Sequence, residues 1–213
     1  MKVAIFGNTL YAGVMSALLS EAGHFVFWCS NIADDSGSHY SFHDENVSHL
    51  LSKQLKSGFL NYCDSKSVPL DTDAYFFSFN QTQESQVFQL LLDLKQQPII
   101  HPKLMINAST FGLHGTEKLK QILSEDDWVY LPDTIQEGNA LHSLTQAKQL
   151  IVGCTHREAQ IKLKELLRPF FPLEQQYFFM PILDAEFTKL SISGMLATRI
   201  SYINDLAVVA EKL

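Results

Sequence analysis

The chain has 213 residues and a formal net charge of −7, and 46% of its residues are hydrophobic while 18% are charged. This length and composition support a substantial core in one large domain, or in one domain with an appendage, and exclude a chain that is disordered by composition. The acidic balance argues against a general binder of nucleic-acid backbones, and no apolar run reaches the roughly 18 residues of a membrane span, so we expect neither nucleic acid nor a membrane as a partner.

The beginning of the chain predicts a strand, a helix and a second strand. Lys2–Phe6 is a short apolar run that ends at Gly7, as in a buried parallel strand. Residues 14–22 have helical spacing and stop before Gly23, a residue type that accepts the positive φ of a helix end. Phe25–Cys29 is the second apolar run. The first strand starts without a preceding signal peptide, which favours a cytoplasmic protein.

The rest of the chain continues the alternation of helices and strands. After a polar surface excursion at residues 31–44, the expected helices are residues 46–57, 84–95, 117–123, 157–167 and 184–213. The expected strands are residues 74–79, 104–107, 128–131, 150–153 and 177–180. This alternation predicts an α/β fold with a doubly wound parallel sheet of the Rossmann type and helices on both faces. We expect residues 1–181 to form this domain and residues 182–213 to form a C-terminal helix.

The turn after the first strand has the pattern of a dinucleotide-binding loop with one alteration. Such loops use three glycines, for the tight turn, for the approach of backbone to the pyrophosphate, and for helix–strand packing. Gly7 holds the first position, Ala12 is an accepted third residue, and Thr9 places a branched side chain where the pyrophosphate meets bare backbone. The expected cofactor-binding residues of this turn are Gly7, Asn8, Thr9, Leu10, Tyr11 and Ala12. A tight turn is also needed by any doubly wound domain, with or without a nucleotide.

The end of the second strand is altered as well. A carboxylate normally stands there to accept hydrogen bonds from the adenosine ribose, and Ser30 occupies that position in this chain. Asp34 and Asp35 follow in the polar excursion. We therefore expect Ser30 to be a cofactor-binding residue, and binding of NAD to be weak or lost.

Five segments of the chain form a more specific pattern in a fixed order. They are Glu21-Ala-Gly-His24-x-Val26, the stretch 106–119 with Ser109-Thr110 and Gly115-Thr116, the loop Leu131-Pro132-Asp133 to Ala140, the strand 150–153, and Asp184-Ala-Glu186-x-Thr-Lys189 with Asn204. Together they resemble the N-terminal half of the UDP-glucose/GDP-mannose dehydrogenases, in a truncated and diverged form. The resemblance extends over essentially the whole chain.

The resemblance implies an oxidation of a nucleotide sugar, from a C6 alcohol to a carboxylate, in two NAD-linked hydride transfers with a cysteine nucleophile. It implies that Lys189 stabilises the oxyanion, that Asp133 replaces a glutamate, and that Thr110 contacts the nicotinamide side. Other positions depart from the family. Ser193 stands for an asparagine, and the segment that holds the cysteine lies in a C-terminal half that is not found here.

Three functions follow as hypotheses. The first is the NAD-binding half of a nucleotide-sugar dehydrogenase of polysaccharide biosynthesis, which acts on UDP-glucose or a similar substrate and is not competent alone. The second is a pseudoenzyme, a degenerate Rossmann module that binds a nucleotide or a protein. The third is a one-step dehydrogenase that uses Lys189 and Asp133 on a small alcohol, and Lys189 also has the simpler interpretation of a surface pair with Glu186.

The remaining cysteines and histidines predict no metal site. Cys29, Cys63 and Cys154 are odd in number and widely spaced, which fits reduced thiols, and Cys154 after a strand has the pattern of a small buried side chain. His39, His43 and His49 lie in a polar stretch without regular ligand spacing.

The C-terminal helix presents an apolar stripe. Its members recur at three- and four-residue steps and are Ile192, Leu196, Ile200, Ile203, Leu206, Ala210 and Leu213. Leaving such side chains in water forfeits about 1.5–3 kcal/mol each. The stripe therefore predicts either folding back onto the sheet domain or pairing with another chain, and a homodimer through this helix is the favoured alternative.

Overall fold

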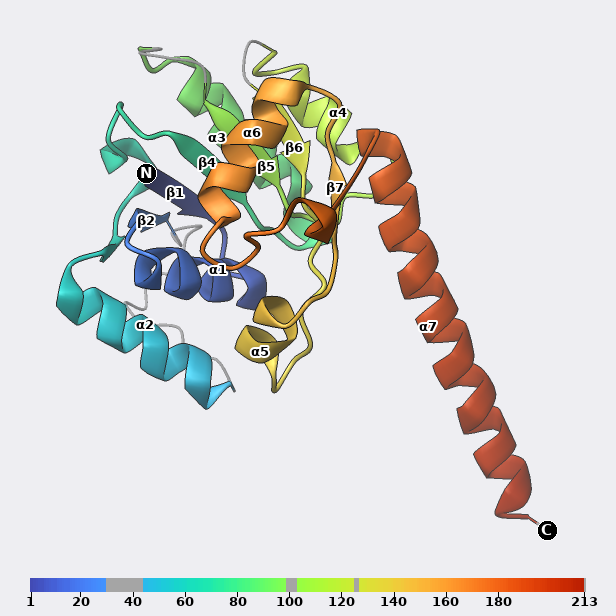
Figure 1. Cartoon of the computed structure of the whole chain (residues 1–213). Coiled ribbons are helices and arrows are strands. Elements are labelled where there is room, and N and C mark those ends of the chain that lie inside the picture. The colour runs from blue at the N-terminus through green and yellow to red at the C-terminus, as the bar shows by residue number, and fades with distance from the viewer. Residues whose placement is uncertain (30–43, 99–102, 125–126, 213) are drawn as a thin grey trace.

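A computed structural model describes residues 1–29, 44–98, 103–124 and 127–212 of the chain. Within these ranges, eight strands form one sheet in the order β3-β2-β1-β4-β5-β6-β7-β8 (Figure 1). The strands are β1 (Lys2–Phe6), β2 (Phe25–Cys29), β3 (Leu60–Tyr62), β4 (Ala74–Phe77), β5 (Leu104–Asn107), β6 (Asp127–Tyr130), β7 (Leu150–Gly153) and β8 (Tyr177–Met180). The helices are α1 (Leu10–Glu21), α2 (Glu45–Ser57), α3 (Glu84–Lys95), α4 (Gly115–Lys120), α5 (Ala140–Thr145), α6 (Arg157–Leu167) and α7 (Ile182–Ala210).

Helices cover both faces of the sheet. One cluster of buried apolar side chains joins α1, α2, α5 and α6 to the sheet, and a second cluster joins α3 and α4 to the opposite face. The central strands β1, β4, β5 and β6 are almost entirely buried on both faces, which explains their continuous apolar runs, whereas the edge strands β3 and β8 are partly exposed. The order of the first six strands reverses direction between β1 and β4, as in the doubly wound Rossmann fold that the sequence predicts. That fold class is confirmed.

One strand pair departs from the expected parallel sheet. β7 runs antiparallel to β6, and its register there is the single pair Tyr130↔Gly153. The connection between them contains the short helix α5, which packs beside α1 and α2 rather than crossing the sheet. Without a crossover, β7 starts at the carboxyl edge of β6 and runs back along it. β8 then pairs with β7 in parallel, through α6.

Several boundaries differ from the sequence-based expectation. The helix expected at residues 14–22 starts at Leu10, because the Thr9 side chain caps it. The strand β3 and the helix α5 were not expected, since each is short and has too few apolar residues to form a period. The α2 helix ends at Gly58 with a φ of 81°, as its glycine predicts.

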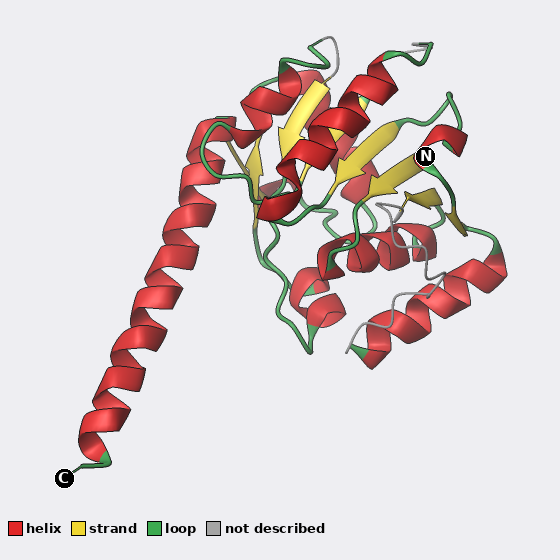
Figure 2. Ribbon diagram, turned by 180° about the vertical axis from the view of Figure 1, so that it is seen from behind, coloured by secondary structure: helices red, strands yellow, loops and turns green. Residues whose placement is uncertain are grey.

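The α7 helix projects away from the rest of the molecule (Figures 1 and 2). Its first turns contact β6 and β7, where Ala185 and Glu186 are buried. From Ser191 onward every described residue of the helix is exposed. The alternative in which the apolar stripe folds back onto the sheet is therefore wrong. In the described part of the chain, no helix has both the length and the apolar character of a bilayer span.

Candidate functional site

The turn after β1 is built around Gly7. This residue has a φ of 116°, and a Cβ at its position would overlap the carbonyl oxygen of Ser78. Its amide donates to the Cys29 carbonyl at 3.2 Å, and its own carbonyl accepts from the Trp28 indole at 2.8 Å. Only glycine satisfies both the dihedral angle and the close approach of β4, so the turn is held against β2 and β4 at the same time.

Thr9 is the N-cap of α1. Its hydroxyl accepts from the Ala12 amide at 3.1 Å and shares a hydrogen bond of 2.6 Å with the hydroxyl of Ser78. The threonine side chain therefore already has partners within the protein, at the position where a glycine was expected in a dinucleotide loop. The first turn of α1 contains no acidic residue, which leaves the partial positive charge of this helix end uncompensated.

A cavity of about 480 Å³ opens beside this turn, at the carboxyl ends of β1, β4 and β5. It is lined by Asn8, Thr9, Leu10, Ser78, Phe79, Asn80, Gln81, Ala108, Thr110 and Asp133. The structure thus brings Thr9 together with Thr110 and Asp133, each of which lies more than a hundred residues after it in the sequence. The location is the point where the strand order reverses, the usual ligand crevice of an open α/β sheet.

The lining residues after β4 were not among the site residues predicted from the sequence. Ser78 bonds Thr9, and Phe79, Asn80 and Gln81 extend the same wall. Their position directly after a predicted strand could have identified them, because residues at the carboxyl ends of the strands beside the reversal point face the crevice.

Thr110 belongs to a loop that hydrogen bonds hold in place. Within this loop the Asn107 side chain donates to the Thr116 hydroxyl at 2.9 Å and accepts from the Ser109 amide at 3.0 Å. The Ser109 hydroxyl accepts from the amide of Phe79 at 3.0 Å. The loop is therefore tied to the end of β4, and Thr110 faces the cavity from a fixed backbone.

Asp133 and Lys189 lie together at the far wall. One carboxylate oxygen of Asp133 accepts from the Ile135 amide at 3.0 Å. Burial raises the pKa of Asp133, and the Ile135 amide and the Lys189 charge oppose that rise. The Lys189 ammonium donates to the backbone carbonyl of Asp133, behind the cavity lining. This arrangement places an acid with a raised pKa in the crevice and a positive charge directly behind it.

Glu186 has a role that the sequence analysis did not find. Its buried carboxylate accepts from the amides of His114 and Thr116, both at 2.8 Å. The simpler interpretation of Lys189 as a surface pair with Glu186 is wrong, because Glu186 faces α4 while Lys189 contacts Asp133. The carboxylate thereby fastens the first turn of α7 to the loop that presents Thr110.

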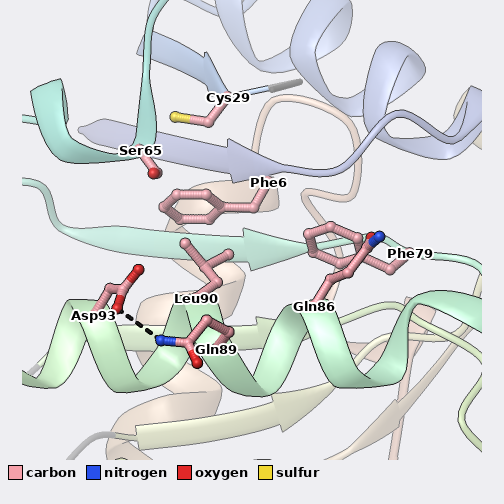
Figure 3. Close-up of a pocket in the computed structure, with 8 residues that line it drawn as sticks. All are labelled: Phe6, Cys29, Ser65, Phe79, Gln86, Gln89, Leu90 and Asp93. Carbon is pink, nitrogen blue, oxygen red and sulfur yellow. Dashed lines mark hydrogen bonds between the residues drawn. The ribbon is translucent and has the colours of Figure 1, made fainter. Parts of the chain in front are cut away.

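A second cavity of about 250 Å³ lies over the ends of β1 and β2, between α3 and the loop that follows β3 (Figure 3). It is lined by Phe6, Cys29, Ser65, Phe79, Gln86, Gln89, Leu90 and Asp93. Phe79 borders both cavities, so the two lie side by side along the carboxyl edge of the sheet. This second cavity has an apolar floor and a polar rim.

Other predicted residues lie elsewhere. The Tyr11 side chain is buried against Phe76, and burial raises its pKa, so its backbone alone is near the turn. Ala12 is also buried in α1. Cys154 is buried, as expected, and burial raises the pKa of its thiol. The predicted contact at Ser30, along with Asp34, Asp35, His39 and His43, lies outside the described residues.

The described ranges contain no group of three or more His, Cys, Asp or Glu side chains arranged to hold a metal ion. His49 lies exposed on α2, and Asp44 caps the same helix through the Val47 amide at 3.3 Å. The second oxygen of Asp44 accepts from the Ala140 amide at 3.0 Å. This carboxylate is therefore engaged in joining α2 to α5.

The fold and the crevice define a Rossmann-type α/β domain whose open cavity lies at the turn after β1. No protein-family model matches the chain. UDP-glucose 6-dehydrogenase TuaD of Bacillus subtilis is 25% identical over 232 residues, which cover 100% of this chain and 49% of that protein. The chain spans about half the length of the curated relatives it matches.

Solved structures show the same fold. A UDP-glucose dehydrogenase from Pyrobaculum islandicum superposes with a TM-score of 0.81 at 17% identity, over 96% of this chain and 52% of that one. A GDP-mannose dehydrogenase from Pseudomonas aeruginosa gives 0.79 at 16% identity, over the same shares of the two chains. The chain matches the NAD-binding N-terminal half of UDP-glucose and related nucleotide-sugar dehydrogenases, and the resemblance expected from its five segments is confirmed.

Proposed function

We propose that this chain is the coenzyme-binding half of an NAD-dependent nucleotide-sugar dehydrogenase of the UDP-glucose 6-dehydrogenase type, and that oxidation of the sugar requires a second half. The observation that carries the proposal is the cavity at the strand reversal, which holds Thr9, Thr110 and Asp133 together at the N-terminus of α1. In folds of this class, that crevice receives a dinucleotide. The match over the whole chain to UDP-glucose 6-dehydrogenases supports the same coenzyme.

The two adjacent cavities suggest how NAD lies. The Gly7 turn would hold the pyrophosphate, because the backbone amides of Leu10 and Tyr11 open a helix without acidic residues in its first turn. The cavity of Figure 3, at the end of β2, would accommodate the adenosine. Thr110, after β5, would contact the nicotinamide side. Bound there, NAD supplies the hydride acceptor.

Asp133 and Lys189 supply the acid–base and electrostatic parts. Because the pKa of Asp133 is raised by burial, its carboxyl group exchanges a proton with a substrate hydroxyl more readily near neutral pH than an exposed aspartate does. The Lys189 ammonium, held by the Asp133 carbonyl behind the cavity lining, adds positive charge to this wall and so favours negative charge that develops on the substrate oxygen. The thiol for the second oxidation step is assigned to the relatives' other half, since Cys154 is buried away from the cavity.

In this proposal, the chain acts as a dimer in the cytoplasm. We assign residues 1–181 to the coenzyme domain and residues 182–213, which contain α7, to a dimerisation segment. Two copies pair through the exposed apolar side chains of α7. The product, a sugar acid nucleotide, is a precursor for polysaccharide biosynthesis.

A second candidate is a pseudoenzyme that keeps the fold without the coenzyme. The hydrogen bonds of the Thr9 hydroxyl to Ala12 and Ser78 favour it, because they satisfy the turn in the absence of a phosphate. Such a module would use its exposed surfaces for a protein or another nucleotide.

Calorimetric titration of the purified chain with NAD, NADH and NADP separates these functions. Binding of NAD without turnover of UDP-glucose supports the incomplete dehydrogenase. If neither NAD, NADH nor NADP binds, the pseudoenzyme is supported. Turnover of UDP-glucose by the chain alone would contradict the need for a second half. A Thr198→Val variant, altered on the exposed part of α7, is the matched control and should titrate as the unmodified protein does.

A further inference from the structure

Two cysteines that are far apart in sequence meet at the carboxyl ends of β2 and β3. The sulfur atoms of Cys29 and Cys63 lie 3.1 Å apart and share a hydrogen bond. Both cysteines are free thiols. Neither residue is used by the proposed hydride transfer, so the pair calls for a separate explanation.

The backbone places the two residues as direct neighbours. Trp28 pairs with Tyr62 in the parallel register of β2 and β3. Cys29 and Cys63 are the residues that follow this pair along the two strands. The Cys63 amide donates to the Trp28 carbonyl at 3.2 Å, which continues the ladder to this pair. Adjacent strands lie about 4.8 Å apart, and disulfides join Cα atoms about 4.4–6.8 Å apart. A bond between these sulfurs therefore needs a side-chain shift of about 1 Å and no rearrangement of the sheet.

The two thiols differ in their surroundings. Cys29 is 5% exposed and forms part of the wall of the cavity in Figure 3, beside Phe6, whereas Cys63 is half-buried. The hydrogen bond from Cys29 lowers the pKa of Cys63, while the same contact and burial raise the pKa of Cys29. Cys63 is the more exposed of the two, so it is the thiol that an oxidant reaches first, and Cys29 is the buried partner that follows.

We propose that Cys29 and Cys63 form a reversible redox pair, which a peroxide closes into a disulfide between β2 and β3 at the edge of the cavity. The Cys63 thiolate attacks one peroxide oxygen, the O–O bond breaks, and a sulfenic acid and hydroxide form. The Cys29 sulfur then displaces the sulfenic hydroxyl, so that the S–S bond forms and water leaves. Two thiols lose two electrons in total, and the peroxide takes them up with the two thiol protons to become two waters. A dithiol reductant reverses the change by exchange.

The disulfide would lie close to the turn after β1 that is built around Gly7. The Cys29 carbonyl accepts from the Gly7 amide, so the bond would fasten β3 to the strand that supports this turn. Cys154 stands apart, with its sulfur donating to the His156 carbonyl at 3.4 Å. It serves as an internal reference thiol.

The test treats the full chain with hydrogen peroxide, unfolds it, alkylates it with iodoacetamide and measures its mass. We expect alkylation to fall from three cysteines to one. We also expect the mass before alkylation to fall by about 2 Da, with a peptide that links Cys29 to Cys63 and full recovery after dithiothreitol. Cys154→Ser should keep the cross-link, and Cys63→Ser should abolish it.

Three results would overturn the redox pair. The first is that all three cysteines are still alkylated after a peroxide dose that oxidises a free model thiol. The second is a cross-link between two molecules. The third is sulfinic acid on Cys63 while Cys29 stays open to alkylation. Because Cys63 is half-buried, the Cys63→Ser variant is expected to fold, and its circular dichroism and melting curve verify that before the oxidation is scored.

Discussion

Thr9 lies between the turn after β1 and the end of β4, and substitutions can remove first its methyl group and then its whole side chain. In Thr9→Gly we expect NAD to bind roughly tenfold more tightly, because the branched side chain no longer faces the pyrophosphate. The same change should destabilise the fold by about 1 kcal/mol, since the cap on Ala12 and the bond to Ser78 are lost. Calorimetry gives the affinity and urea unfolding gives the stability.

Thr9→Ser is the matched control for that experiment. Serine keeps the hydroxyl that caps α1 and bonds Ser78, and it removes only the methyl group. We expect the stability of Thr9→Ser to stay near that of the unmodified chain. Its NAD affinity should lie between those of the unmodified chain and Thr9→Gly. Equal or weaker binding of NAD by Thr9→Gly would show that the threonine does not obstruct the coenzyme.

Asp133 makes a prediction about pH. Its pKa is raised above the ordinary value of 3.8 because burial penalises the carboxylate, and the unfolded chain lacks that penalty. A raised pKa in the folded state gives stability that is full below the unfolded pKa and is lost as the pH rises through the folded one. At neutral pH the Asp133 carboxylate therefore weakens the fold.

Asp133→Asn should be more stable than the unmodified chain at pH 7, because asparagine keeps an oxygen for the Ile135 amide without the buried charge. The difference should shrink as the pH falls toward 4, where the aspartate takes up its proton. Urea midpoints between pH 4 and 8 measure this, with the exposed Asp205→Asn as control. If the difference in stability between Asp133→Asn and the unmodified chain is constant over this range, burial does not raise the pKa of Asp133.

At the scale of elements, Glu186 joins α7 to α4, and both of its oxygens accept backbone amides. Glu186→Ala leaves the buried Thr116 amide and the part-buried His114 amide without this partner, so we expect a loss of about 3 kcal/mol in the free energy of unfolding. Glu186→Gln keeps one acceptor oxygen and should lose roughly half as much. Asp205→Ala, on the exposed part of α7, should change stability by less than about 0.5 kcal/mol. Equal effects of the alanine and glutamine variants would contradict this role.

The elements themselves were largely predictable from the sequence, and the tertiary partners were not. The apolar runs of β1 and β5 and the periodic pattern of α3 predict their elements because burial imposes a pattern on neighbouring residues. The contact of Cys29 with Cys63 depends on the pairing of β2 with β3, and the strand β3 has too few residues to show a period. The cap by Glu186 crosses 72 positions of sequence to His114, and no local pattern encodes such a distance.

At the scale of the whole molecule, α7 is the feature that a single copy leaves unexplained. The exposed large apolar side chains of its outer part are Ile192, Met195, Leu196, Ile200, Tyr202, Ile203, Leu206, Val208 and Val209. They cover more than one side of the helix, and at about 1.5–3 kcal/mol each their exposure to water is costly. One stripe of them can pair with a second copy.

We expect the chain to sediment as a dimer at micromolar concentration. Leu196→Asp combined with Ile203→Asp should weaken dimerisation by roughly 100-fold, because each places a charge in the centre of the paired stripe. Ser201→Asp adds one such charge about half a turn away from the stripe, and should leave the dimer intact. The sheet domain is not touched by these changes, so far-ultraviolet circular dichroism should stay constant. A monomer at every concentration of the unmodified chain would refute the helix-paired dimer, as would equal loss of dimer in Ser201→Asp, because then the apolar stripe would not be the surface that joins the two copies.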